Sequence, residues 1–314
     1  QVMSELYEAI VNGKSSGNQS VTQAVAQIKK AGNKAVVVSG IQDENAQLLA
    51  LAINHALQSV VIDVVATKNV RQGNTTKVNQ LMKDMASGAV GAVLIANTNP
   101  VYSLPKGSAF AEALKKVPLS VAFSMSANQT TDAAQYVVAT PHFLESWGDA
   151  EIKKGQYSLV QPTIQPLFKT RQLEDCLLSW AGGEGTYYEY LKNHWQLNLL
   201  GGRSWNKTLQ EGTFTVAHED MTATPNQVDV NAASAAVASI SGAEMELTVY
   251  AKTGLGDGQQ ANNPWLQELP DPITRTSWDN YLLISRIDAE KLGVSNRTVD
   301  NGALNGDLVN ITAN

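Results

Sequence analysis

Apolar residues recur at two different spacings along residues 1–140. Short runs rich in β-branched residues predict buried strands at 35–40, 60–65, 91–96, 119–123 and 136–139. Between these runs, apolar positions three and four apart predict amphipathic helices at 21–31, 44–57, 75–85 and 108–116. This alternation is typical of an α/β fold: a doubly wound, mostly parallel sheet with helices on both faces and right-handed crossovers.

The pattern changes after Pro141. Residues 141–168 are irregular, apolar spacing predicts helices at 171–180 and 186–195, and the Ala-, Asn- and Thr-rich stretch 219–236 is typical of a linker. From residue 243 the alternation is that of strands, at 244–250, 278–285 and 307–312. We therefore predict a Rossmann-like domain at 1–140, a mixed helical and irregular connecting region at 141–238, and a small, incomplete β-barrel-like domain at 239–314.

The segment Ala261–Pro272 is unusual because it holds three prolines in nine residues. Proline removes a backbone donor and disfavours a helix before it, so we expect a rigid, extended segment. Trp265 lies among these prolines, and we expect its side chain to be buried against a partner.

Composition excludes several classes of function. The chain has 314 residues, 43% of them hydrophobic and 17% charged, and its net charge of -6 is spread along the sequence. Basic residues form no run longer than a pair, so we expect no nucleic-acid partner. No apolar run reaches the roughly 20 residues that a membrane span needs, so we expect no direct membrane insertion. The chain begins without Met and without the pattern of a signal peptide, and we expect it to be a fragment or a processed product.

Cys176 is the single cysteine of the chain. One cysteine forms no internal disulfide and cannot supply the four thiolates of an iron–sulfur cluster. Its place on an apolar helix face favours an inert, buried thiol over a nucleophile or a molybdenum ligand. The four histidines show no short pair at metal-ligand spacing.

Candidate chemistry lies at the carboxyl ends of the predicted strands, where open α/β sheets bind ligands. Ser39 and Gly40 follow the first predicted strand and could hold a phosphate at a helix N-terminus. A tight turn is favoured, because the chain has no glycine-rich fingerprint there. Asn97 and Asn99 follow a later strand, and their amides could read the edge of a nucleotide base. Turn chemistry alone also favours these residue types.

Two further pairs of polar residues could be mistaken for catalytic groups. His142 and Glu145 lie three apart and could form an acid/base pair, although a structural role is favoured. Asp271 and Asp279 could be paired carboxylates, but each is better explained as the cap of a turn.

The order of the segments carries more information than any one of them. The series comprises 34–40, 92–100, 136–141, 144–149, 156–166, 171–175, the proline-rich segment, 283–285, 288–293 and 306–309. It resembles the molybdopterin oxidoreductase family of dimethyl sulfoxide and polysulfide reductases over nearly the whole chain. In particular it resembles the molybdopterin-enzyme-like region of the B subunits of alternative complex III, which are quinol:electron-acceptor oxidoreductases.

The resemblance implies a location for the candidate residues. In the family the strand–loop Asn-Pro motif lies by one pterin guanine dinucleotide, which would place Asn97 and Asn99 there. Ser39 and Gly40 would complete a remnant of that nucleotide pocket. The final β domain of the family closes over the pterins, and Ala261–Pro272 and Ser285–Leu292 would belong to it.

The chain also departs from the family pattern. The cluster cysteines and the Cys, Ser or Asp metal ligand of the first family domain are absent, and Lys154-Gly155-Gln156 replaces the usual Glu-Gly-Arg. The B subunits that the chain resembles carry iron–sulfur clusters in a separate ferredoxin-like part. We therefore expect this piece to hold no cofactor and no catalytic residue.

The leading hypothesis is a structural region that packs against the iron–sulfur part of the same subunit and against haem-containing and membrane-integral subunits. The complex would lie on the periplasmic face of a bacterial inner membrane and pass electrons from quinol to a cytochrome or copper acceptor. The alternative is a fragment of an active molybdopterin guanine dinucleotide enzyme whose ligands lie outside this chain. A third hypothesis is a nucleotide-binding module built on residues 1–140.

Overall fold

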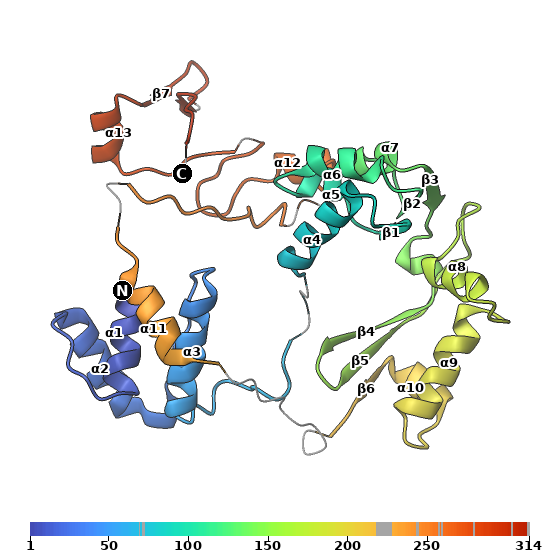
Figure 1. Ribbon diagram of the computed structural model, residues 1–314, viewed down its shortest axis with the longest axis horizontal. Coiled ribbons are helices and arrows are strands. Elements are labelled where there is room, and N and C mark those ends of the chain that lie inside the picture. Colours follow the sequence, from blue (N-terminus) through green and yellow to red (C-terminus); the bar gives the residue numbers. More distant parts are fainter. Residues whose placement is uncertain are drawn as a thin grey trace.

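The computed structural model describes residues 1–68, 70, 73–217, 228–242, 245–256, 258, 260–278, 280–302 and 304–312. Figure 1 shows these residues as several groups of packed elements joined by long connections. The first three groups along the chain each have a small core of buried side chains.

Helices alone form the first group. It contains α1 (Val2–Ile10), α2 (Gln19–Ala31), the 3-10 turn η1 (Gly32–Lys34), α3 (Glu44–Ala56) and, from far along the chain, α11 (Val230–Ser239). Asn18 and Asp43 cap α2 and α3 by accepting backbone N–H bonds, which explains where these helices begin. Leu49 and Ile53 of α3 are fully buried against Tyr7 of α1 and Val237 of α11.

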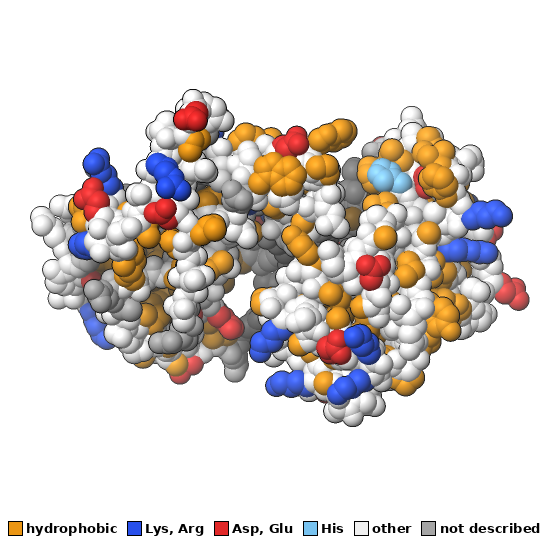
Figure 2. All heavy atoms as spheres, turned by 90° about the horizontal axis from the view of Figure 1, so that it is seen from above, with side chains coloured by type: hydrophobic (Ala, Val, Ile, Leu, Met, Phe, Trp, Pro, Cys, Tyr) orange, Lys and Arg blue, Asp and Glu red, His pale blue; other side chains and the backbone are white. Residues whose placement is uncertain are grey.

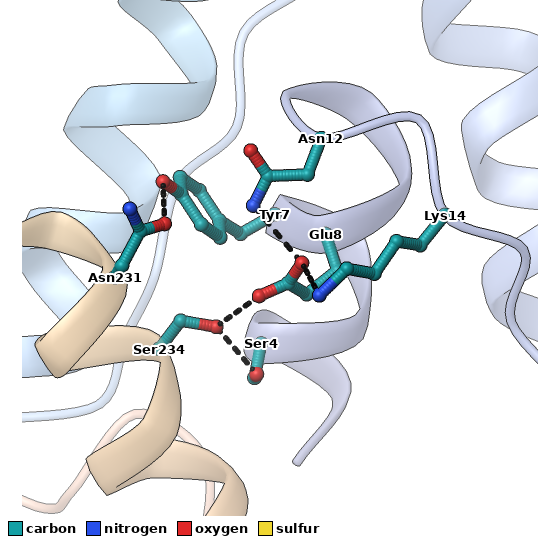
Figure 3. Close-up of polar contacts among 7 residues, drawn as sticks. All are labelled: Ser4, Tyr7, Glu8, Asn12, Lys14, Asn231 and Ser234. Carbon is teal, nitrogen blue, oxygen red and sulfur yellow. Dashed lines mark hydrogen bonds and ion pairs between the residues drawn. The ribbon is translucent and has the colours of Figure 1, made fainter.

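Polar contacts also hold α11 against α1 (Figure 3). The Ser4 and Ser234 hydroxyls lie 2.8 Å apart, and Ser234 donates to Glu8 at 3.1 Å. Glu8 in turn pairs with Lys14 at 2.8 Å. The stretch 219–236 was predicted to be a linker, and this is wrong for residues 230–236, which begin α11. Five alanines favour a helix here and Asp229 caps it, whereas residues 219–227 lie outside the described part.

The second group is a parallel three-stranded sheet. Its strands are β1 (Ala92–Ala96), β2 (Leu119–Ser124) and β3 (Tyr136–Ala139), in the order β1-β2-β3. The helices α4 (Thr75–Ala86), α5 (Pro100–Ser103), α6 (Gly107–Leu114) and α7 (Gln129–Ala133) accompany them. Met85, Phe110 and Leu114 pack against Val93 and Ile95 on one face. On the opposite face Trp180 of α8 (Leu173–Trp180) contacts Phe123, with ring centroids 6.1 Å apart. The predicted mixed α/β fold with a parallel sheet flanked by helices is confirmed.

The strands predicted at 35–40 and 60–65 are wrong. Both segments lack strand pairing, although residues 35–40 run beside α3. Asn54 of α3 explains the difference for the first segment, because its side chain occupies both backbone groups of Val37. The Val37 N–H donates to Asn54 Oδ1 at 2.8 Å, and Asn54 Nδ2 donates to the Val37 carbonyl at 2.8 Å. At the start of the second segment, the Val60 N–H donates to the Asn33 carbonyl. The Ser59 hydroxyl donates to the Ala35 carbonyl.

An antiparallel sheet and three helices make the third group. The strands are β4 (Gly148–Lys153), β5 (Gln156–Val160) and β6 (Thr213–Thr215), and the helices are α8, α9 (Tyr187–Asn198) and α10 (Trp205–Glu211). The predicted helices at 171–180 and 186–195 are confirmed within a few residues. The irregular prediction for 141–168 missed the β4–β5 hairpin, whose turn uses Gly155 at a φ of 77°. The 3-10 turn η2 (Phe143–Glu145) precedes β4.

The C-terminal part is extended, with a few short elements. They are α12 (Pro264–Glu268), α13 (Arg286–Leu292) and the hairpin β7 (Asn296–Thr298) with β8 (Leu304–Gly306). The predicted strands at 244–250, 278–285 and 307–312 are wrong for their described residues, which pair with no neighbouring strand. Within the described residues no barrel closes.

The proline-rich segment also differs from its prediction. Residues 264–268 form the short helix α12, because Pro264 occupies the first helical position, where no N–H is needed. Trp265 has 82% of its surface exposed, so it is not buried within the described part of this chain, and its burial against a protein partner stays a prediction. The segment folds on itself instead, since Gln267 donates to the Ala261 carbonyl at 2.8 Å and Trp278 N–H donates to the Gln267 carbonyl at 2.8 Å.

Candidate functional site

The loop after β1 is the candidate site with the most ordered geometry. Asn97 ends the strand with a left-handed φ of 50°, and its N–H still donates to the Phe123 carbonyl at 3.0 Å. Asparagine tolerates this backbone region better than most residues do, which explains the residue type. The Asn97 side chain is exposed at the carboxyl edge of the sheet. Asn99 follows two residues later as the N-cap residue of α5.

The Asn99 amide is bonded to α7. Its Oδ1 accepts from the Thr130 hydroxyl at 2.7 Å and from the Thr130 N–H at 3.2 Å. Its Nδ2 donates to Gln129 Oε1 at 2.8 Å. The Thr130 hydroxyl also accepts from the Val101 N–H at 3.1 Å, so one cluster joins the loop after β1 to the start of α7. The acceptor oxygen of Asn99 is therefore already saturated by protein donors.

The neighbouring strand ends add a second polar cluster. Asn128 caps α7, and its Nδ2 also donates to Ser124 Oγ at 3.2 Å. The Thr140 N–H, at the end of β3, donates to the Ser124 carbonyl at 3.1 Å. The Thr140 hydroxyl is buried and has no hydrogen-bond partner within the described part of the chain. The carboxyl edge is thus rigid and internally bonded, with one unsatisfied hydroxyl.

Ser39 and Gly40 do not join this edge. They lie just before α3 in the helical group, apart from β1 in Figure 1. The Ser39 carbonyl accepts from Gln47 Nε2 at 3.0 Å, and the Ser39 hydroxyl accepts from the Ile41 N–H at 3.3 Å. These bonds are those of a turn onto α3. The four residues of the predicted pocket therefore fall into two separate places.

The C-terminal part approaches α5, close to the candidate edge. A Cβ added at Gly258 would lie 3.4 Å from the ring of Tyr102 in α5. Figure 1 likewise draws α12 beside α5 and α6. Near α12, residues 252–255, 266–267 and 269–272 enclose an open hollow of about 360 Å³. This hollow belongs to the proline-rich segment itself.

The remaining candidates have local partners. The His142 N–H donates to Glu145 Oε2 at 3.1 Å, and His142 Nδ1 accepts from the Leu144 N–H at 3.3 Å, so both residues cap η2. Asp271 caps a turn by accepting from the N–H groups of Ile273 and Thr274 at 3.0 and 2.8 Å. Those bonds lower the pKa of the Asp271 carboxyl, with the Thr274 N–H as the main cause. Asp279 lies outside the described residues.

Cys176 is half-buried in α8. Burial raises the pKa of its thiol, with a smaller opposing effect from Arg171. A raised pKa disfavours the thiolate, which is the reactive form.

Two kinds of feature are absent from the described residues. No three His, Cys, Asp or Glu side chains gather closely enough there to hold a metal ion. No helix of that part has both the length and the apolar character of a membrane span.

Comparison with known proteins gives one informative match. No family model matches the chain. It is 32% identical over 191 residues to the molybdopterin-binding-like subunit of a menaquinone reductase from Nitratidesulfovibrio vulgaris, over 53% of this chain. Over this part the chain is therefore similar to a molybdopterin-binding-like protein. The match spans 28% of that relative, well under half of its length.

The sequence analysis did not identify the residues that form hydrogen bonds with the side-chain amide of Asn99. Gln129 and Thr130 were not singled out, although Asn128 followed by Thr131 has the spacing of a helix N-cap box. That signal could have placed a helix start beside the Asn97–Pro100 loop. Asn54 left no comparable signal, because a buried amide inside an apolar helix face resembles an ordinary helix position.

Proposed function

We propose that this chain is a structural, non-catalytic region of a subunit of a respiratory quinone- or quinol-linked electron-transfer complex, descended from a molybdopterin enzyme. The main support is the engagement of Asn99, whose amide is bonded to Thr130 and Gln129. A residue whose acceptor is already saturated is poorly placed to read a nucleotide base. The relative is itself described as molybdopterin-binding-like, which suits a region that keeps the ancestry of such enzymes.

The residues present do not fit a bound pterin nucleotide as a set. Ser39 and Gly40 turn onto α3, whereas Asn97 and Asn99 lie at the sheet edge. We therefore derive no chemical step through a pterin. Iron–sulfur clusters would belong to another part of the full-length subunit, as in the B subunits of alternative complex III.

The large exposed surface supports the proposal that this chain is part of a multi-subunit complex. The chain exposes 22142 Å², whereas a compact monomer of 33.7 kDa would expose roughly 13,000 Å². In Figure 2 hydrophobic side chains lie over several parts of the visible face. Surface of this extent and character is typical of protein that packs against other protein. We propose the iron–sulfur part, haem-containing subunits and membrane-integral subunits as the partners, on the periplasmic face of the membrane.

One observation favours the rival function, a region of an active molybdopterin-dependent oxidoreductase. Asn97 combines a left-handed backbone with an exposed amide at the carboxyl edge of a parallel sheet. Such backbone strain is frequent at ligand sites.

Metal and pterin analysis of the full-length subunit separates the two functions. Elemental analysis for molybdenum and the fluorescence of acid-released pterin should both give substoichiometric values. One molybdenum per subunit, with matching pterin, would overturn the structural proposal. A paired test compares Asn99→Ala with Asn97→Ala for quinol oxidation by the complex. Both variants should keep the wild-type rate, because neither amide touches a reacting group in this proposal.

The predicted division at residues 140 and 238 stays a prediction. Limited proteolysis would test it, since boundaries fall in exposed connections where few contacts cross. Cleavage clustered at those two positions would support the division.

A further inference from the structure

A continuous row of aromatic rings crosses the third group. Trp147 and Tyr188 have centroids 4.5 Å apart, and Tyr188 lies 6.3 Å from Trp205. Trp205 lies 6.1 Å from Trp195, and Trp195 lies 6.1 Å from Tyr157. We call these five residues the aromatic row. Each ring is in contact range of the next, so no aliphatic side chain needs to interrupt the path.

The aromatic row runs from one partly exposed end to the other through a buried middle. Trp195 is fully buried and Trp205 nearly so. Trp147 and Tyr157, at the two ends, are half-buried. Small oxidants and reductants in solution can therefore reach the ends, whereas the middle is shielded.

Carboxylates lie beside two neighbouring rings of the aromatic row, Trp195 and Tyr157. The Trp195 indole N–H donates to Asp149 Oδ2 at 2.7 Å. Tyr157 lies directly opposite Glu151, its cross-strand partner in β4, so the carboxylate acts on the Tyr157 hydroxyl. Burial, followed by the negative charge of Glu151, raises the pKa of Tyr157. The Trp205 indole N–H, by contrast, is buried without an acceptor within the described residues.

This asymmetry has a consequence for oxidised rings. A tyrosine that loses an electron also loses its phenolic proton, and a neighbouring carboxylate can take it. Two carboxylates, Asp149 and Glu151, also stabilise positive charge at this end by direct attraction. Trp205 has neither advantage, so an electron vacancy on Trp205 is less stable than one at Tyr157. Packing accounts for the burial of the rings, but it does not require both carboxylates at one end.

We propose that the aromatic row carries oxidising equivalents from the Trp147 end to Tyr157. A one-electron oxidant of the oxygen-radical class removes an electron from Trp147. An electron from Tyr157 then refills Trp147 through the intervening rings, and the Tyr157 proton passes to Glu151. The products are a neutral tyrosyl radical and a protonated Glu151. A soluble thiol or ascorbate returns the electron, and Glu151 returns the proton. This activity would protect the fold from oxidative damage, and it does not depend on the function proposed above.

Flash photolysis with a tethered oxidant tests the proposal. In a Cys176→Ser background, Ser146→Cys beside Trp147 carries a ruthenium polypyridyl sensitiser, which a light flash and a diffusing acceptor convert to a one-electron oxidant. Transient absorption and electron paramagnetic resonance identify the radical. We expect a neutral tyrosyl radical, formed more slowly in deuterated water because a proton moves with the electron.

Three variants assign the radical and the path. Tyr157→Phe should lose the tyrosyl signal and leave a tryptophanyl signal. Glu151→Gln removes the base while keeping the shape, and should slow tyrosyl formation. Trp205→Phe should sharply reduce the yield, after circular dichroism has shown that the variant folds. Trp180→Phe, outside the aromatic row, is the matched control and should change nothing.

Opposite results overturn the proposal. An unchanged tyrosyl signal in Tyr157→Phe would place the radical on another tyrosine. An unchanged yield in a folded Trp205→Phe protein would show that charge does not cross the aromatic row. Glutamine at position 151 keeps an oxygen for the Gly155 N–H, which Glu151 Oε1 accepts at 2.8 Å, so the Glu151→Gln result reports loss of the base and not loss of the turn.

Discussion

Replacing Asn54 with leucine tests why residues 35–40 form no strand. Asn54 has only 3% of its surface exposed, and its amide makes both bonds to the Val37 backbone at 2.8 Å. Leucine keeps the branching of asparagine at Cγ, although its two methyl groups are larger, and it cannot make either bond. Each lost bond is worth about 0.5–1.5 kcal/mol net, so local opening of this segment should become easier by about 1–3 kcal/mol. The lower half of that range is favoured because Val37 is only half-buried and water can partly replace the amide.

Hydrogen exchange at the Val37 amide measures this change directly. Local opening governs exchange in a folded protein, so about 1–3 kcal/mol corresponds to roughly 5–150-fold faster exchange. His55→Ala, at the next and exposed position of α3, is the matched control and should leave the Val37 exchange rate unaltered. If Asn54→Leu also left that rate unaltered, the amide would not be what holds this segment on α3.

Three further predictions concern other parts of the chain. Trp265→Ala should change the free energy of unfolding by less than about 0.5 kcal/mol in urea titrations, because the side chain is 82% exposed. Gly107→Ala should destabilise the protein by about 1–3 kcal/mol or more, since the new Cβ would lie 1.9 Å from the Val101 carbonyl oxygen; a normal melting temperature would contradict it. Bonds from Lys14 and then Asn12 lower the pKa of Glu8, so its contribution is full above its ordinary pKa of about 4.3 and is lost as the pH falls through the lowered value. Protection of α11 amides, after correction for the pH dependence of intrinsic exchange, should therefore fall on acidification, and Glu8→Gln should remove that fall.

Helices and the central parallel sheet followed from sequence because their signals are local. Asn18, Asp43 and Thr186 stand at helix starts and cap them, and the apolar run of β2 is largely buried as its composition indicates. In β1, by contrast, Val93 and Ile95 are buried but Leu94 is exposed. Caps and periodicity act within one or two turns of chain, so they can be read without knowing the fold.

Contacts between residues far apart in the sequence could not be predicted in the same way. The run 35–40 has the composition of a buried strand, yet an amide from α3 takes its backbone bonds. Tryptophan is a residue type that usually buries its side chain. Trp265 nevertheless lies on the short helix that Pro264 begins, and it is 82% exposed there. In both cases the conformation of the segment depends on which distant groups contact it. The local sequence does not specify those groups. The location of Asn97 and Asn99 at a strand end was predictable, whereas the bonds from Gln129 and Thr130 were not.

Asn54 and Asn99 occupy two different groups but act in the same physical way. Each uses a side-chain amide to satisfy groups that would otherwise seek another partner: a neighbouring strand for Val37, and a ligand at the sheet edge for the loop after β1. An amide suits this task because it offers a donor and an acceptor together, as a backbone peptide does. When a site's own amides occupy its hydrogen-bonding groups, the site becomes more rigid. It then has no free donors or acceptors with which to recognise a ligand. This substitution of internal amides for external partners is what we expect where an ancestral ligand pocket becomes a structural surface.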